Sequence, residues 1–176
     1  MIITISGKPG SGKTTAAKQV AQKLGYKHFS MGDLRGRIAQ KHGMTIDELN
    51  EVGKKEFWTD KEADDELVKL GKEEDNLVMD SWIAYHFIPD SAKIFLEVDL
   101  KVGAERIFKD PRPDEAKKKT IKEVEEMLKK RIANSKARYK KYYDIDYLDK
   151  SNSNYSNLSQ NNKLRTYQNY LLLQFQ

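Results

Sequence analysis

The sequence contains no cysteine. A disulfide framework and a cysteine-based metal site are therefore both excluded, and the composition fits a reducing, cytoplasmic location. Long apolar runs are also missing, and the stretch Leu171 to Leu173 is far too short to span a membrane. Because the first residues are typical of a strand, we expect no N-terminal signal segment and no membrane partner.

Histidine is scarce as well. His28, His42 and His86 show none of the spacings of metal ligands, so we expect them to be structural or surface residues. A Ser/His/Asp arrangement of a hydrolase has no support either. The chain does have an excess of positive charge, with 32 Lys and Arg against 27 Asp and Glu. This balance suits a polyanionic ligand, but it does not choose between a nucleotide and a nucleic acid.

Residues 7–14 carry the most specific pattern in the chain. The run GKPGSGKT fits G-x-x-x-x-G-K-[ST], a loop that binds phosphate groups. The run before it, residues 1–6, is apolar and β-branched, and residues 15–24 place Ala and Val at helical spacing. A strand, a glycine-rich turn and a helix are the context that this motif needs. The pattern therefore predicts a nucleoside triphosphate site.

Each residue type in the loop has a physical role. Glycines permit a sharp turn, so that successive N–H groups point into one concavity at the positive end of a helix. Lys13 is expected to reach the β- and γ-phosphates, and the Thr14 hydroxyl to bind Mg²⁺. The predicted ATP-binding residues are Gly7, Lys8, Pro9, Gly10, Ser11, Gly12, Lys13, Thr14 and Thr15.

Beyond the loop, strand-like and helix-like segments alternate. This order predicts a three-layer α/β/α sandwich with a parallel sheet. Strands are expected at residues 1–6, 26–30, 77–80 and 93–98. Helices are expected at 15–24, at 33–42, at 60–72, at 102–108 and from 120 to about 143, and a further helix is expected to begin at Thr45. Asp33 is the expected N-cap of the second helix, Gly71 the expected stop of the helix at 60–72, and capping boxes open the helices at Thr45 and Thr120.

Ligands of parallel α/β folds gather at the carboxyl ends of the strands. Lys13, Asp33 and Asp80 each follow a predicted strand, so we expect them to share one cleft. Asp80 ends an apolar run and is a candidate Mg²⁺ ligand, directly or through water; the alternative is a carboxylate at a turn. Arg35 is placed to clamp a phosphate-bearing second substrate; the alternative is a solvated helix face.

Two segments differ from the rest. The stretch at about 109–120 is charged, contains two prolines and has almost no apolar residues, which predicts a mobile lid. From residue 151 on, fourteen of 26 residues are Asn, Ser or Gln and none is acidic. This composition predicts disorder early in the tail, 151–176, while its last residues, 167–175, could pack or form an edge strand.

The motifs together resemble the archaeal-type cytidylate kinases, which are nucleoside monophosphate kinases. The resemblance runs from Met1 to about Asp149. It rests on the loop, on Ser30 to Arg35, on Asp80, on Ala104 to Ile107, and on Arg131 to Tyr143. The segment from Ser30 to Arg35 is also close to adenylate kinases. The resemblance implies one kinase domain at 1–150, with an acceptor-binding region at about 33–72 and a lid at about 109–120.

The family transfers the γ-phosphoryl group of ATP to CMP or dCMP with Mg²⁺, and no covalent enzyme intermediate is expected. The resemblance implies that Thr14 and Asp80 serve the metal, that Arg106 lies against the donor nucleotide, and that Ser30, Arg35, Asp80 and Arg138 bind the acceptor. Lys13, Arg112 and Arg131 are the implied catalytic residues, with Arg112 in the lid. A monomer without a nucleic acid partner is expected.

The chain departs from the family in two places. Members usually carry Gly-Arg or Ser-Arg after the carboxylate at position 80, whereas here Ser81 is followed by Trp82. An acceptor-binding arginine is therefore missing, and Trp82→Arg is expected to raise kcat/KM for CMP. Members also continue past Lys150 into a final strand, and no such strand is predicted within 151–176. An adenylate kinase-like enzyme, a non-catalytic ATP-binding module and an ATP-using nucleic-acid-binding protein are the alternatives.

Overall fold

The computed structural model describes residues 1–111 and 118–158 of the 176-residue chain. Its centre is a sheet of five parallel strands in the order β2-β3-β1-β4-β5. The strands are β1 (Ile2–Gly7), β2 (Lys27–Ser30), β3 (Leu77–Asp80), β4 (Ala92–Glu97) and β5 (Tyr155–Leu158). The predicted α/β fold with a parallel sheet is confirmed.

Helices connect the strands and cover both faces of the sheet. They are α1 (Lys13–Leu24), α2 (Met31–Lys41), α3 (Ile46–Gly53), α4 (Trp58–Glu73), α5 (Ala84–Phe87), α6 (Leu100–Lys109) and α7 (Ile121–Tyr143), with a 3-10 turn η1 (Lys150–Asn152) before β5. Within the described part of the chain, no helix is long and apolar enough to cross a membrane.

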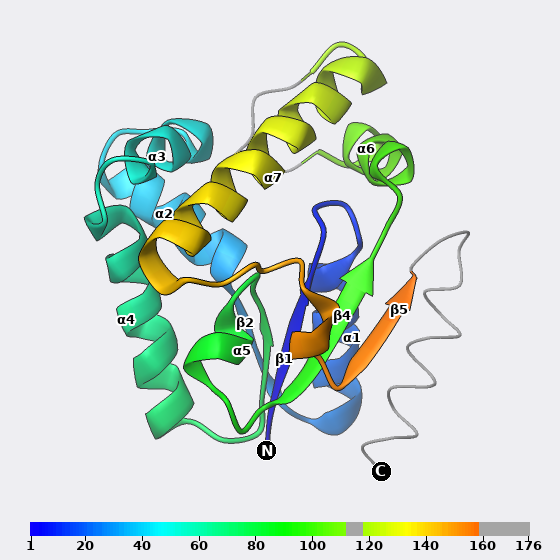
Figure 1. Cartoon of the computed structure of the whole chain (residues 1–176). Coiled ribbons are helices and arrows are strands. Elements are labelled where there is room, and N and C mark those ends of the chain that lie inside the picture. The colour runs from blue at the N-terminus through cyan, green and yellow to red at the C-terminus, as the bar shows by residue number, and fades with distance from the viewer. Residues whose placement is uncertain (112–117, 159–176) are drawn as a thin grey trace.

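Alternation along the strands builds two cores. Val78 of β3 points to the face covered by α1, where it joins Ile3 and Ile5 of β1. Leu77 and Met79 point to the other face, where α2, α3, α4 and α5 pack. In Figure 1, α1 lies behind the sheet and α5 in front of it. These are the three layers that the sequence predicts.

All five strands run in one direction, so their carboxyl ends meet at a single edge of the sheet. In Figure 1 the strand arrows point upward, and α7 crosses above them. The loop after β1, the start of α2 and the residues after β3 therefore come together beneath α7. The fold places the predicted site at this edge.

Several predicted helix boundaries are wrong. Ser30 rather than Asp33 caps α2, and its hydroxyl accepts from the Asp33 N–H at 3.4 Å. Gly71 lies inside α4, which continues to Glu73. The capping box at Thr45 is confirmed, with both reciprocal bonds present. At Thr120 only half of the box forms, because the Glu123 carboxylate accepts from the Lys119 N–H instead.

The tail also differs from the prediction. Residues 155–158 form β5, which pairs in parallel with β4 and completes the sheet at that edge. The expectation that no strand follows Lys150 is therefore wrong. Asn154 fixes the register, since its backbone N–H donates to the Lys93 carbonyl at 2.9 Å and its side chain accepts from the Lys93 N–H at 2.9 Å. The predicted packing of residues 167–175 lies outside the described residues.

Candidate active site

The loop between β1 and α1 has the geometry of a phosphate cradle. Gly7, Gly10 and Gly12 all have positive φ, at 137°, 75° and 85°. A Cβ atom at Gly7 would collide with the backbone of Leu96, and one at Gly10 would lie 2.6 Å from the Cα of Gly103. Both the backbone conformation and the close approach of β4 and α6 therefore require glycine here.

Lys13 begins α1 and folds back over the loop. Its ammonium donates to the carbonyls of Gly7 at 3.0 Å and Lys8 at 2.9 Å. The pKa of this ammonium is lowered to about 8. Loss of hydration is the largest cause, the Asp80 carboxylate acts against it, and the Arg131 guanidinium adds to it. The cation is thus held in the loop, close to where the motif places a phosphate.

Asp80 is buried at the end of β3 and contacts three side chains. Thr14 donates to Oδ1 at 3.0 Å and Ser30 to the same oxygen at 3.2 Å. His28 lies 2.8 Å from Oδ2. The contacts join β3 to α1 and β2, and they place the Thr14 hydroxyl beside the carboxylate.

A buried charge cluster lies where α2, α3, α4 and α7 meet. Arg35 of α2 donates to Asp60 at 3.0 Å and to Asn50 at 3.0 Å. Arg138 of α7 donates to the same Asn50 oxygen at 3.2 Å and lies 3.5 Å from Asp60. Burial, and then the neighbouring Arg138 charge, lower the pKa of Arg35, whereas Asp60 raises it. Two guanidinium groups therefore share one carboxylate.

The remaining predicted arginines come from the helices above the sheet. Arg131 of α7 donates to Asp47 of α3 at 3.0 Å. Arg106 of α6 donates to the carbonyl of Gly10 at 3.4 Å. Arg112 lies outside the described residues, and so does half of the predicted lid, residues 112–117, so the lid stays a prediction.

One cleft of about 1090 Å³ brings these groups together. Lys13, Asp33 and Asp80 all line it, which confirms their predicted convergence. The lining residues are Pro9, Gly10, Gly12, Lys13, Thr14, Thr15, Lys18, Met31, Gly32, Asp33, Arg35, Ile46, Asn50, Asp80, Ser81, Trp82, Arg106, Ile107, Asp110, Pro111, Arg131 and Tyr139.

Some predicted site residues do not line the cleft. Arg138 is buried and contacts Asn50 and Asp60, so it shares both partners of Arg35. Ser30 acts on Asp80 and caps α2. Gly7, Lys8 and Ser11 shape the loop from behind, and Lys8 forms an ion pair with Glu97 at 3.2 Å.

Sequence reasoning missed three residues at the site. His28 contacts the Asp80 carboxylate, and Asp47 holds Arg131. Asn50 of α3 accepts from both buried arginines and lines the cleft. The position of His28, two residues before Ser30 on a strand parallel to β3, is the signal that could have revealed it; nothing in the sequence marks Asn50.

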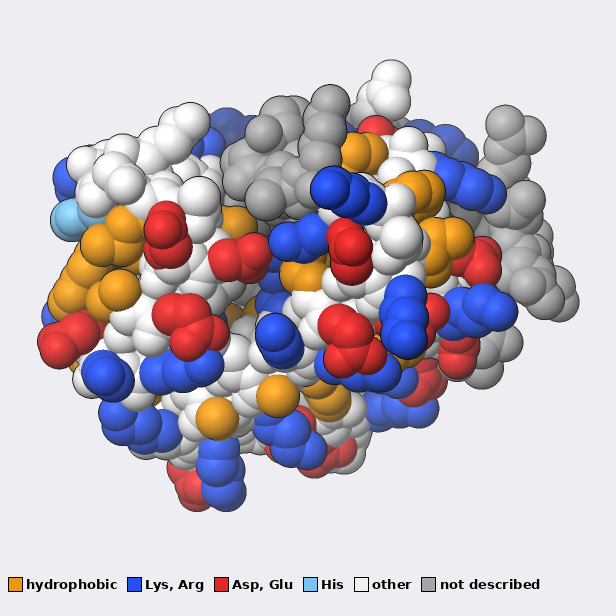
Figure 2. Space-filling model, turned by 90° about the horizontal axis from the view of Figure 1, so that it is seen from above, with side chains coloured by type: hydrophobic (Ala, Val, Ile, Leu, Met, Phe, Trp, Pro, Cys, Tyr) orange, Lys and Arg blue, Asp and Glu red, His pale blue; other side chains and the backbone are white. Residues whose placement is uncertain are grey.

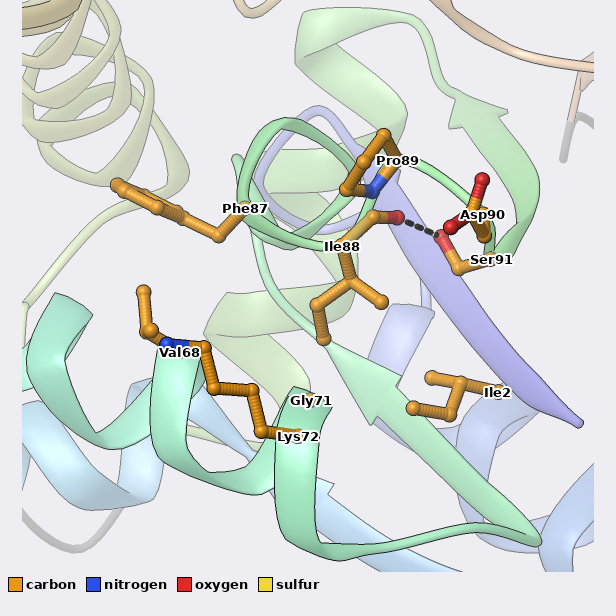
Figure 3. A pocket seen from close by; sticks show the side chains of 9 residues that line it. All are labelled: Ile2, Val68, Gly71, Lys72, Phe87, Ile88, Pro89, Asp90 and Ser91. Atoms are coloured by element: carbon orange, nitrogen blue, oxygen red, sulfur yellow. Dashed lines mark hydrogen bonds between the residues drawn. The ribbon is translucent and has the colours of Figure 1, made fainter.

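A second pocket, of about 260 Å³, lies at the other end of β1 (Figure 3). Val68 and Lys72 of α4, Phe87 of α5 and Ile2 of β1 line it, and the Ser91 hydroxyl closes one side by donating to the Ile88 carbonyl at 2.8 Å. Its lining is mostly aliphatic and aromatic. It lacks the cluster of cations that the large cleft provides.

The large cleft fits a nucleoside triphosphate and a magnesium ion. Gly7 and Gly10 hold the loop tightly against β4 and α6, because a Cβ atom at either position would collide with the backbone there, and such a glycine-rich turn before a helix is the kind of loop that binds phosphate oxygens. Mg²⁺ prefers oxygen ligands and keeps several waters, and Thr14 and Asp80 offer oxygens 3.0 Å apart. No group of three or more His, Cys, Asp and Glu side chains gathers within the described residues. Phosphate oxygens and water would therefore complete the coordination.

The fold and the cleft define a P-loop phosphotransferase. Solved structures of shikimate kinases share the fold: the one from Bacteroides thetaiotaomicron has a TM-score of 0.66 at 19% identity and covers 99% of this chain and 98% of that chain. The one from Aquifex aeolicus has a TM-score of 0.60, also at 19% identity, and covers 99% of this chain and 96% of that chain.

Sequence comparison narrows the class. A family model described as an AAA domain matches residues 3–139. The cytidylate kinase of Haloarcula marismortui is 37% identical over 154 residues, which cover 86% of this chain and 77% of that protein. The cytidylate kinase of Sulfurisphaera tokodaii is 34% identical over 156 residues, covering 86% and 82%. The chain belongs to the archaeal cytidylate kinase family and is a nucleoside monophosphate kinase.

Proposed function

We propose that the protein transfers the γ-phosphoryl group of ATP to CMP or dCMP, forming ADP and CDP or dCDP. The observation that carries the proposal is that one cleft holds the Lys13 loop, the pair of Thr14 and Asp80, and the guanidinium of Arg35. The loop suits the donor phosphates, and the guanidinium suits a second phosphate. The names of the related proteins support cytidylate as the acceptor.

The transfer needs positioning and charge stabilisation rather than proton removal. An oxygen of the acceptor phosphate, already ionised at neutral pH, attacks the γ-phosphorus, and the bond to the bridging oxygen of ADP breaks. Lys13 and Arg131 carry positive charge beside the cradle, where negative charge shifts during the transfer. A magnesium ion held by Thr14 and Asp80 would neutralise the donor phosphates.

The contacts of Asp80 agree with this scheme. A carboxylate held by Thr14, Ser30 and His28 is fixed in place, which suits a metal ligand. No general base is needed, because the attacking oxygen carries no proton. Arg35 clamps the acceptor phosphate, and Asn50 and Asp60 hold its guanidinium in orientation.

A panel assay tests the proposal. The full chain is mixed with ATP, Mg²⁺ and, in separate reactions, CMP, dCMP, UMP, AMP and GMP, and ADP release is measured by a coupled assay. We expect CMP and dCMP to give the highest kcat/KM. Preference for AMP would establish the adenylate kinase-like alternative, and ATP binding without turnover of any monophosphate would establish a non-catalytic module.

A further inference from the structure

Trp82 lines the large cleft. It follows Asp80 by two residues, so the end of β3 fixes its backbone. Its side chain is half-buried. An indole has no cation for a phosphate group, but it offers a flat aromatic face.

The ring is held by two tyrosines. Tyr147, which is fully buried, stacks on Trp82 with ring centroids 5.1 Å apart and planes 24° apart. Tyr139 lies at 6.4 Å from Trp82 and 5.6 Å from Tyr147, nearly perpendicular to both. The face of Trp82 opposite Tyr147 is its far face. A ring stacked on that face would lie about 10 Å from Tyr147, because the centroids of two stacked rings are each about 5 Å from the ring between them. Tyr139 therefore flanks the stack and does not lie on that far face.

The sheet order places Trp82 on the acceptor side of the cleft. β3 and β2 lie on one side of β1, and β4 lies on the other. Arg35 follows β2, whereas α6, with Arg106, follows β4 and touches the loop at Gly10. The donor side is thus next to β4, and the residues after β3 face the acceptor.

We propose that Trp82 is the stacking platform for the nucleobase of the acceptor monophosphate and so determines acceptor affinity. The inference rests on the proposed function, since it requires a nucleotide acceptor. Stacking on an indole that lines the cleft uses the π-face that every base has, and a pyrimidine monophosphate supplies one planar ring together with the phosphate that Arg35 is proposed to bind.

Tryptophan fluorescence tests this contact directly, because the chain has two tryptophans. In the Trp58→Phe protein, Trp82 is the sole indole. We expect CMP to quench its emission, and ribose 5-phosphate, which has the phosphate but no base, to leave it unchanged. The Trp82→Phe protein, in which Trp58 remains, is the control and should show no base-dependent change.

Kinetics give a second readout. Trp82→Leu should raise KM for CMP about tenfold, which is the scale of a lost stacking contact, and leave KM for ATP within about twofold. Trp82→Phe should keep most of the affinity, and melting curves show whether each variant folds. Trp82→Arg should also lose affinity, whereas a missing phosphate contact predicts a gain in kcat/KM.

The outcomes separate the two proposals. The panel assay comes first, and the acceptor that it identifies is the nucleotide used in the titration. Turnover without base-dependent quenching, or a gain in kcat/KM for Trp82→Arg, overturns the stacking platform alone. Absence of turnover with every monophosphate overturns the proposed function, and the platform with it.

Discussion

Arg35 lies at the boundary between the cleft and the buried charge cluster, so its replacement should separate acceptor binding from donor binding. Arg35→Ala removes a bidentate donor to phosphate, and we expect KM for the acceptor to rise about tenfold to a hundredfold, on the scale of a charge-assisted hydrogen bond. KM for ATP should change little. Steady-state kinetics with each substrate varied in turn measure both.

Arg37→Ala is the matched control for this variant. Arg37 lies two residues further along α2 and is exposed, so its removal should leave both KM values unchanged. Equal rises in the two KM values for Arg35→Ala would place this guanidinium at the donor phosphates instead. Arg35→Ala should also melt at a lower temperature than the parent protein, since Asp60 would lose its ion pair with Arg35 at 3.0 Å and keep the longer one with Arg138 at 3.5 Å.

Asp64 gives the fold a pH dependence that can be isolated. Burial raises the pKa of this carboxyl from 3.8 to about 6, against the hydrogen bond from Tyr143, which lowers it. The folded state therefore binds the proton more tightly than the unfolded state, and the stabilisation present below pH 4 is lost as the pH rises through 6. Asp64→Asn keeps an acceptor for Tyr143 and removes the ionisation.

We expect Asp64→Asn to change the free energy of unfolding in a pH-dependent way. Relative to the parent protein, the variant should be more stable at pH 8 than at pH 4 by up to about 3 kcal/mol, because this is the free energy that corresponds to the difference in the carboxyl pKa between the folded and unfolded states. Urea unfolding at the two pH values measures the difference. Asp65→Asn is the control, because Asp65 is exposed and pairs with Lys61 at 2.6 Å. An effect of Asp64→Asn that is equal at both pH values would contradict the raised pKa.

For single residues, the sequence predicts the site residues that belong to a motif and misses those that reach the site only through the fold. Lys13 and Thr14 follow from the loop pattern, and Asp80 from its place after an apolar run. Asn50 could not be found, because its role depends on α3 packing beside α2 and α7. The family resemblance implies that Arg138 binds the acceptor, whereas the fold buries it beside Asn50 and Asp60, the partners of Arg35.

Among the elements, α6 packs its backbone directly against the phosphate loop. Gly103 of α6 lies against Gly10, and a Cβ atom on Gly103 would sit 3.0 Å from the Pro9 carbonyl oxygen. Gly103→Ala should push the loop by a few tenths of an ångström and raise KM for ATP about threefold or more, since packed interiors transmit such strain. KM for CMP should stay nearly constant.

The stability of Gly103→Ala should change little, because the better helix propensity of alanine, roughly 0.5–1 kcal/mol, offsets the crowding. Kinetics and a melting curve on the same preparation check both statements. Lys101→Ala, at an exposed position of the same helix, is the control. An unchanged KM for ATP in Gly103→Ala would mean that α6 yields instead of the loop.

Element boundaries show where local signals are sufficient. The strands β1, β3 and β4 follow from apolar runs, since buried parallel strands are apolar on both faces. β5 does not, because its residues, YSNL, are polar for a strand, and pairing with β4 decides its conformation. Gly71 fails as a stop because α4 packs beside Ile88 at that turn, so tertiary contact overrides a weak local preference.

At the scale of the whole molecule, the chain has a formal excess of five positive charges. Figure 2 shows Lys and Arg side chains interspersed with Asp and Glu over the face above the sheet. We therefore expect no tight binding of RNA at physiological salt, since such binding needs a continuous basic surface. Anisotropy of a labelled single-stranded RNA at about 50 and 150 mM salt measures this; affinity below micromolar at the higher salt would favour the nucleic-acid-binding alternative.

The cluster around Asp60 has a practical consequence for anyone handling the protein. Arg35 and Arg138 share one carboxylate, and the charge of Arg138 lowers the pKa of Arg35, so we expect an anion that binds Arg35 in the cleft to reduce the repulsion between the two guanidiniums. An anion that binds the folded chain but not the unfolded chain raises the melting temperature of the protein by mass action. Sulfate or phosphate in the buffer should therefore act as a competitor of the acceptor and as a stabiliser, not as an inert component.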